Sequence, residues 1–182
     1  MFSLSGKKAL VVGIANEMSI AYGCARALRG QGADIAVTYL NEKAEPHVRP
    51  LADALEAELI EPLDVREDGQ YARLFEAVRA RWGRLDICLH SVAFCPREDL
   101  HGRVVDCSRG GFTTAMDVSV HSFIRMVRGA EPLMPSGGTC MTVSFYGAEK
   151  VVDHYNVMGP VKAALESVTR YMAAELGPKK IS

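Results

Sequence analysis

The stretch KKALVVGIANEMSIAYG, residues 7–23, decides the fold of this chain. It begins with KKALVV, residues 7–12, which predicts a short buried strand because its last four residues are apolar. Gly13 follows directly, and a segment of small and polar residues then leads to an amphipathic pattern through Cys24, Ala27 and Leu28 that predicts a helix. The order is therefore strand, glycine-containing turn, helix.

The turn between this strand and this helix suits a pyrophosphate group. Gly13 lets the backbone approach phosphates, and Ser19 places a hydroxyl at the start of a helix whose free amides favour an anion. The spacing differs from the common Gly-x-Gly-x-x-Gly pattern of dinucleotide-binding turns. On local grounds an ordinary tight turn, with Ser19 as the helix N-cap, is an equal alternative.

Strand and helix patterns alternate along the rest of the chain, with no linker, repeat or low-complexity tract. Further strands are predicted at residues 33–40, 59–63, 85–90 and 139–143. Four further helices are predicted: one that begins near Pro46, one over about 68–82, one that includes Phe123 and Val127, and one around Tyr155. Repeated βα units of this length predict one α/β domain over residues 1–182, with a doubly wound parallel sheet and helices on both faces. A ligand then binds beyond the carboxyl ends of the strands.

Length and composition agree with this architecture and argue against several classes of protein. With 182 residues, 48% of them hydrophobic, the chain can bury a sizeable core. A formal net charge of −1 argues against a surface for nucleic acid or anionic membranes, and no apolar run approaches the length of a membrane span. The N-terminus enters the first strand almost at once, which leaves no room for a signal peptide, so we expect a cytoplasmic protein.

Five scattered cysteines, with no Cys-x-x-Cys pair, indicate a reducing compartment. Cys88 and His90 alternate along one predicted strand and raise the alternative of a metal site. No further ligands stand at a recognisable spacing, so we expect no metal and interpret the two as a small buried residue and a histidine at the end of a strand.

Tyr155 and Lys162 are the pair that points to chemistry. A separation of seven residues along an α-helix returns two side chains to one face with a slip of about 20°, so we expect both on one helix. A cation favours phenolate character in a tyrosine, and a phenol can hydrogen-bond or protonate an oxygen derived from a carbonyl. This combination suits a reductase, whereas taken alone such a pair is more often a solvated helix face.

Two strand ends offer further candidates. Asp64 and Val65 follow the third predicted strand, where the carboxylate could meet an adenine amino group; a cap on the next helix is the alternative. Ser91, Val92 and Ala93 follow the fourth strand with small side chains, which would let the backbone run close to a flat cofactor. A simple strand exit is the alternative there.

Several motifs follow one another along essentially the whole chain: Gly13-x5-Ser19-Ile20-Ala21-x-Gly23, Asp64-Val65, HSVAF at 90–94, SFYGAE at 144–149, and YNVMG at 155–159 with Lys162-Ala163. Together they resemble the motifs of the bacterial enoyl-acyl-carrier-protein reductases of the short-chain dehydrogenase/reductase superfamily. The resemblance implies a Rossmann-type fold and NADH-dependent reduction of the carbon–carbon double bond of a trans-2-enoyl thioester on acyl carrier protein. The setting would be type II fatty-acid synthesis, usually in a homotetramer.

The resemblance also implies a role for single residues, divided by the part of the cofactor or substrate that they meet. The pyrophosphate and nearby ribose would be held by Gly13, Ala15, Ser19 and Ile20. The adenine would be flanked by Asp64 and Val65, and the nicotinamide side lined by Ser91, Val92 and Ala93. Lys162 would bind the nicotinamide ribose hydroxyls, and Tyr155 would stabilise the enolate oxygen that forms when hydride reaches the β-carbon.

Three positions depart from the family pattern. Phe145 stands where the family usually has a second active-site tyrosine, so we expect it to form a wall beside the substrate. Leu40 stands where many relatives have glutamine near the adenosine ribose; the absence of arginine there favours NADH, while Lys43 keeps NADPH open. Cys95 stands beside the expected substrate position, where an exposed thiol would react only if its pKa were lowered.

The family pattern continues beyond the last residues of this sequence, Ile181 and Ser182, into further strands and a substrate-covering lid. The resemblance therefore implies a domain without its last strands and lid, with an uncovered edge on the fifth strand and lower stability. Two other functions stay open. One is another short-chain reductase acting on a ketone or ketoacyl thioester; the other is a non-catalytic nucleotide-binding subunit.

Overall fold

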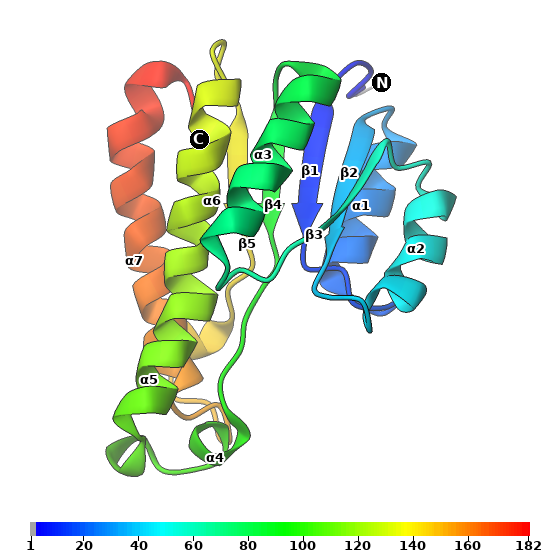
Figure 1. Ribbon diagram of the computed structural model, residues 1–182. Coiled ribbons are helices and arrows are strands. Elements are labelled where there is room, and N and C mark those ends of the chain that lie inside the picture. The colour runs from blue at the N-terminus through cyan, green and yellow to red at the C-terminus, as the bar shows by residue number, and fades with distance from the viewer. Residues whose placement is uncertain (1–2) are drawn as a thin grey trace.

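The computed structural model describes residues 3–182, and its centre is one sheet of five parallel strands (Figure 1). The strands are β1 (Lys8–Val12), β2 (Asp34–Tyr39), β3 (Leu59–Pro62), β4 (Ile87–His90) and β5 (Thr139–Thr142). They lie in the order β3-β2-β1-β4-β5, and every pairing is parallel. The predicted doubly wound sheet is confirmed, and its strand order reverses between β1 and β4.

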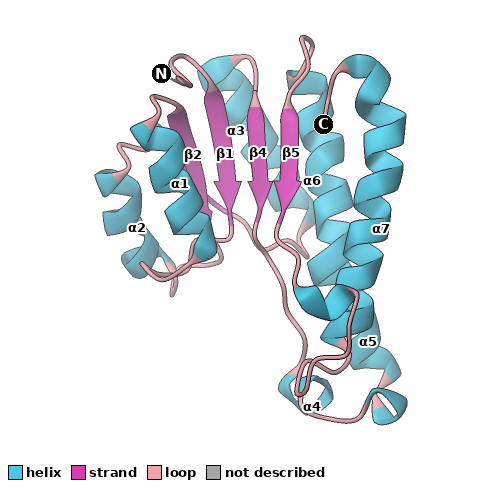
Figure 2. Ribbon diagram, turned by 180° about the vertical axis from the view of Figure 1, so that it is seen from behind, coloured by secondary structure: helices cyan, strands magenta, loops and turns pink. Residues whose placement is uncertain are grey.

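Helices cover both faces of the sheet. Figure 2 shows α1 (Ile20–Gly30) in front of the sheet with α2 (Glu45–Ala54) next to α1, whereas α3 (Asp68–Trp82) and α6 (Ser122–Ala130) lie in front in the opposite view. The long helix α7 (Met158–Leu176) runs beside α6. Within residues 3–182 no helix is both long enough and apolar enough to cross a membrane.

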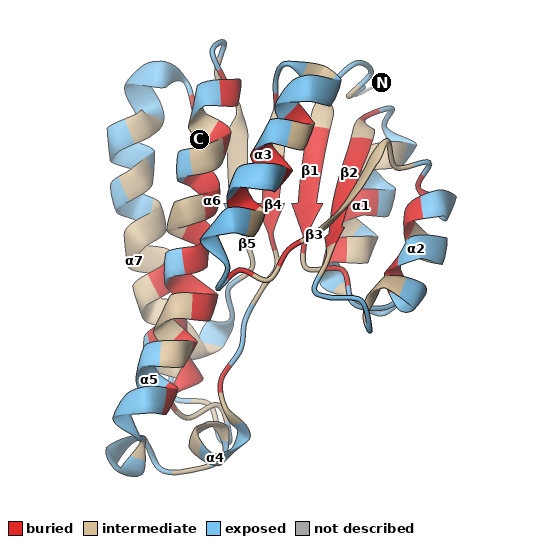
Figure 3. Ribbon diagram, in the orientation of Figure 1, coloured by how far each residue is buried: buried red, intermediate tan, exposed pale blue. Residues whose placement is uncertain are grey.

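The core consists of two apolar clusters, one on each face of the sheet. Along β1, Leu10 and Val12 point into the cluster under α3 and α6, while Ala9 and Val11 point into the cluster under α1 and α2. All four side chains are buried, as Figure 3 shows by colour for the central strands. A strand covered on both faces must be apolar at every position, which explains the unbroken run of residues 9–12.

The helical stretch over residues 109–130 changes from α-helical to π-helical geometry near its middle. It begins with α5 (Arg109–Met116), passes through a π-helical segment (Asp117–His121) and continues as α6. The wider π turn buries the consecutive residues Val118, Ser119 and Val120. The Ser119 hydroxyl accepts a hydrogen bond from Phe94 N at 3.0 Å and donates one to Phe94 O at 3.2 Å, which fixes the chain that leaves β4.

The remaining helical elements of the described residues are short: α4 (Arg97–Leu100) and four 3₁₀ turns at Val104–Asp106, Glu131–Leu133, Tyr146–Ala148 and Gly177–Lys179. After the last of these, residues 180–182 pair in parallel with the start of β5. Ser182 N donates to Gly138 O at 2.9 Å, and Cys140 N donates to Ser182 O at 2.7 Å. Ile181 between them is buried. The expectation of an uncovered β5 edge is therefore wrong over residues 138–140.

Candidate active site

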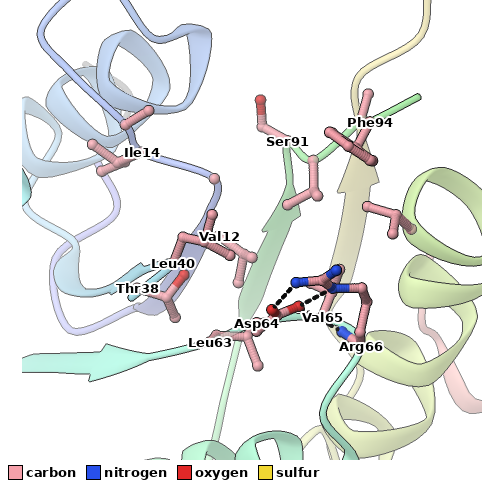
Figure 4. A pocket seen from close by; sticks show the side chains of 15 residues that line it. Val12, Ile14, Thr38, Leu40, Leu63, Asp64, Val65, Arg66, Ser91 and Phe94 are labelled. Carbon is pink, nitrogen blue, oxygen red and sulfur yellow. Dashed lines mark hydrogen bonds and ion pairs between the residues drawn. The ribbon is translucent and has the colours of Figure 1, made fainter. Parts of the chain in front are cut away.

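A cavity of about 320 Å³ lies at the carboxyl ends of the strands, beside the point where the strand order reverses (Figure 4). This is where an open parallel sheet places its ligand. Residues from the exits of β1, β2, β3 and β4 and from the π segment line it: Val12, Gly13, Ile14, Ala15, Thr38, Leu40, Leu63, Asp64, Val65, Arg66, Ser91, Val92, Ala93, Phe94 and Val118.

Gly13 brings the backbone after β1 against the backbone after β4. Its φ is +111°, a conformation that L side chains rarely adopt, and an added Cβ would lie 2.1 Å from Ser91 O. Only glycine fits this position. The two chain exits therefore form a tight backbone floor at the end of the cavity where a flat or phosphate-bearing ligand would lie.

Ser19 fixes the turn that follows Gly13. It is the N-cap residue of α1, but its Oγ accepts hydrogen bonds from Ala15 N and Asn16 N, both at 3.0 Å, and makes no bond to the first helical amides. Its hydroxyl proton stays available to an anion beside the helix N-terminus. Neither Ser19 nor Ile20, which is exposed, lines the cavity itself.

Asp64 lines the cavity and is paired with Arg66, a residue that lies outside the sequence motifs. Asp64 Oδ1 accepts from Arg66 Nε at 2.9 Å and from Arg66 N at 3.0 Å, and Oδ2 accepts from Arg66 Nη2 at 2.6 Å (Figure 4). These charge-assisted bonds hold the pKa of Asp64 below its ordinary value. The N-cap of α3 is Glu67, so the alternative that Asp64 caps this helix is wrong.

His90, at the end of β4, is bonded to one residue of α6 and one of β5. Its Nε2 lies 2.7 Å from Ser122 Oγ, and its Nδ1 lies 3.1 Å from Thr142 Oγ1. Because the Ser122 hydroxyl donates to Val118 O at 2.6 Å, Nε2 carries the imidazole proton and Nδ1 accepts from Thr142. Burial lowers the pKa of His90 to about 3, so the ring is neutral.

The prediction that one α-helix carries both Tyr155 and Lys162 is wrong. Helix α7 begins at Met158, and Tyr155 lies in the turn before it. Asn156 has a left-handed φ of +46°, which interrupts helical geometry between the two residues. Its side-chain Nδ2 donates to Leu100 O at 2.8 Å, a contact between distant parts of the chain that stabilises this conformation.

The two side chains nevertheless contact the same segment, residues 143–147, which leaves β5 at its carboxyl end. Lys162 Nζ donates to Val143 O at 2.7 Å. The Tyr155 ring packs on the Phe145 ring with 4.6 Å between centroids, and a Cβ added at Gly147 would lie 2.4 Å from it. The chain exit of β5 thus brings together the three residues that were expected to be catalytic.

Burial governs the protonation of this pair. It raises the pKa of the Tyr155 phenol above its ordinary value and lowers the pKa of the buried Lys162 ammonium below its own. The prediction that the lysine favours phenolate character is therefore wrong for this arrangement. Tyr155 keeps its proton at neutral pH and can act as a hydrogen-bond donor or acid.

The residues expected from the sequence separate into two groups in the structure. The cavity collects Gly13, Ala15, Leu40, Asp64, Val65, Ser91, Val92 and Ala93, whereas Phe145, Tyr155 and Lys162 lie along the β5 exit. Cys95 belongs to neither group: it is buried in the core, and burial raises its pKa, so it is not a reactive thiol. Sequence reasoning assigned no role in the site to the other lining residues, of which the first four could have been found by their position at strand ends: Val12, Ile14, Thr38, Leu63, Arg66, Phe94 and Val118.

Comparison with known proteins agrees with this geometry. The family model described as enoyl-(acyl carrier protein) reductase matches residues 13–182. The chain belongs to this reductase family. Among curated reductases, it is 46% identical to the NADH enoyl-[acyl-carrier-protein] reductase FabI of Synechocystis sp. over 100% of the chain and 71% of the relative. It is 48% identical to FabI of Aquifex aeolicus over 95% of the chain and 64% of the relative.

Solved reductase structures have the same fold. The Anaplasma phagocytophilum reductase in complex with NAD has a TM-score of 0.95 and 46% identity, with 98% of this chain and 68% of that one covered. The Bacillus cereus reductase, solved with NADP+ and indole naphthyridinone, has a TM-score of 0.95 and 42% identity, with 100% and 71% covered. The chain thus spans 64 to 71% of the length of these four reductases.

Proposed function

We propose that this chain carries the cofactor site and the catalytic residues of an NADH-dependent enoyl-acyl-carrier-protein reductase. The observation that carries the proposal is the arrangement along one edge of the sheet. The cavity closed by Gly13 lies at the exits of β1 to β4, and Tyr155 and Lys162 both contact the exit of the neighbouring strand β5. Family membership supports the same chemistry.

The residues of the cavity fit a dinucleotide. The backbone at Gly13 leaves no room for a side chain, and Ser19 keeps a hydroxyl proton beside the first amides of α1, which suits a pyrophosphate. Leu40, half exposed at the end of β2, offers no positive charge to a 2′-phosphate, which supports NADH. NADPH stays the alternative because Lys43 follows nearby and the Bacillus cereus relative was solved with NADP+.

Each catalytic residue has a role that its surroundings support. Bound NADH would supply the hydride for the β-carbon of the enoyl thioester. Tyr155, kept protonated by burial, would direct its phenolic hydrogen at the thioester oxygen, where negative charge develops. Lys162, anchored on Val143 O, would hold the nicotinamide ribose hydroxyls with its remaining hydrogens, and Phe145 would form a wall beside the acyl chain.

An assay with crotonyl thioester and NADH tests this function through the loss of NADH absorbance. Tyr155→Phe removes only the phenolic hydroxyl, so we expect NADH binding to persist while turnover falls about 10²- to 10³-fold. Faster turnover of an acetoacetyl thioester would instead favour a ketoacyl reductase. NADH binding without turnover of either thioester, and unaltered by Tyr155→Phe, would favour a non-catalytic subunit.

We also propose that the protein works in the cytoplasm as a homotetramer that accepts its substrate on acyl carrier protein. Exposed apolar side chains on two long helical segments support association: Phe112 on α5 and Tyr171 on α7. Light scattering coupled to gel filtration should then give four times the 19.8 kDa chain mass. A mass of one chain at micromolar concentration would refute the tetramer without affecting the reductase chemistry.

A further inference from the structure

Arg66 is held in an unusual way for an exposed arginine. Its side chain is 60% exposed, yet its Nε and Nη2 both bond to the Asp64 carboxylate, and the residue lines the cavity (Figure 4). A planar guanidinium matches the two oxygens of a carboxylate and fixes the plane of both groups. The orientation of Asp64 toward the cavity is therefore set by Arg66.

The loop that carries this pair is itself anchored from two sides. Asp64 N donates to the side-chain Oε1 of Gln70 at 2.7 Å. On the other side, Val65 O accepts a hydrogen bond from Arg125 of α6, whose side chain is only 17% exposed. Because the backbone on either side of the carboxylate is fixed, the Asp64–Arg66 pair has little freedom to turn away from the cavity.

The hydrogen bonds of Asp64 leave a definite acceptor position. An ionised carboxylate has about four acceptor sites, two on each oxygen. Arg66 N and Nε take two bonds to Oδ1, and Arg66 Nη2 takes one to Oδ2. One site on Oδ2 thus remains for a donor in the cavity, and a carboxylate in this state accepts hydrogen bonds only.

We propose that Arg66 is a positioning residue that orients the Asp64 carboxylate to accept a hydrogen bond from the amino group of an adenine ring. The pair thereby selects an amino purine over an oxo purine. This inference rests on the proposed function, which supplies the dinucleotide. At the position of the amino group, an oxo purine presents an oxygen lone pair to Oδ2 instead of an N–H donor, so a ring bound in the same place leaves the acceptor unpaired and brings two oxygens together.

The test compares reduced nicotinamide adenine dinucleotide with its hypoxanthine analogue, which carries an oxygen in place of the amino group. For the full chain we expect the dissociation constant of the analogue to be about tenfold higher. In Arg66→Ala the ratio should fall to about two- or threefold, since an unheld carboxylate is less well oriented. Arg66→Lys, which keeps the charge and loses the planar fork, should give an intermediate ratio.

Two controls separate orientation from general effects. Arg79→Ala removes another half-exposed arginine paired to a carboxylate, that of Glu76, outside the cavity, and should leave the ratio at the value of the unmodified chain. Reduced nicotinamide mononucleotide lacks the purine, so its affinity should be the same in all four proteins.

The outcomes distinguish the role of Arg66 from the proposed reductase function. If the unmodified chain binds neither dinucleotide, the proposed function itself fails. If it binds both equally well, or if Arg66→Ala keeps the full discrimination, the role of Arg66 is refuted while NADH binding and turnover stand.

Discussion

At the carboxyl end of β4, His90 is a buried, neutral imidazole bonded to Ser122 and Thr142. Its pKa is lowered to about 3, whereas a histidine in an unfolded chain has a pKa near 6.5. Between these values the unfolded chain binds the proton and the folded chain does not. The free energy of unfolding therefore rises with pH in this range, by about 1.4 kcal/mol per pH unit for this one group.

His90→Gln removes the titrating ring and keeps side-chain polar atoms for Ser122. We expect the variant to be less stable near neutral pH because it packs less well, and to lose stability less steeply between about pH 6 and 4, by roughly 1.4 kcal/mol per pH unit. Urea denaturation at several pH values measures both slopes. Parallel curves for the two proteins would mean that His90 takes up a proton in the folded state.

The ionisation of Lys162 should make the rate of turnover depend on pH. Burial lowers its pKa below 10.5, so its charge is lost at a lower pH than that of an exposed lysine. We expect kcat/KM to fall on the alkaline side as this cation is lost. Lys162→Arg keeps the charge to above about pH 12 and should move the alkaline limb upward, even if the absolute rate is lower. If the alkaline limb stays at the same pH in Lys162→Arg, the fall in kcat/KM comes from another group, such as the Tyr155 phenol.

Among the elements, the turn between β1 and α1 depends most on one residue. Gly13→Ala would place a Cβ against Ser91 O at a φ that alanine disfavours. We expect a loss of about 1–3 kcal/mol in the free energy of unfolding from backbone strain alone, together with weaker NADH binding. Chemical denaturation and NADH titration measure the two effects.

Gly23→Ala is the matched control within the same strand–turn–helix unit. Gly23 lies inside α1, and among residues 3–182 no atom other than those of its chain neighbours and the nearby backbone of the helix itself comes within 4 Å of a Cβ added there. Alanine should therefore stabilise the helix by up to about 1 kcal/mol and leave NADH binding unchanged. Equal losses of stability and of NADH affinity in the two variants would show that the close approach of Gly13 to Ser91 contributes to neither.

The limits of sequence reasoning also appear at the level of elements. The five strands and α3 were predicted within a few residues, because apolar runs and an apolar stripe are local signals. The start of α7 was not predicted correctly, because the left-handed conformation of Asn156 is stabilised by a hydrogen bond to Leu100 O, which lies 56 residues away in the chain. The pairing of Asp64 with Arg66 was not predicted, for a different reason. Two charged residues at this spacing are common on protein surfaces, and only their position beside the cavity indicates a function.

For the whole molecule, the cofactor should be a source of stability. The cavity lies between strand exits that contact both apolar clusters, so a ligand there binds the folded chain alone. At a hundred times its dissociation constant, NADH should raise the free energy of unfolding by about 2.7 kcal/mol. For a chain of this size, that is a rise of roughly 5–10 °C in the midpoint of thermal unfolding.

Reduced nicotinamide mononucleotide is the control for this measurement. It lacks the adenosine half and makes no contact at Asp64, so at equal concentration it should raise the midpoint less than NADH does. Scanning fluorimetry or calorimetry measures both. Equal rises for the two ligands would show that the adenosine half, with its expected contact at Asp64, adds no binding energy.

The π segment between α5 and α6 has a consequence for how the sequence can change in length. A π turn spans one residue more than an α turn, while the helical stretches on either side keep their apolar faces directed at the same core. Deleting a single residue from 117–121 would restore a plain α-helix and leave Phe123 and Met126 packed as they are. The same deletion a turn later would rotate the following face by about 100° and expose it. In an alignment of relatives, a one-residue gap inside this helix should therefore fall within 117–121.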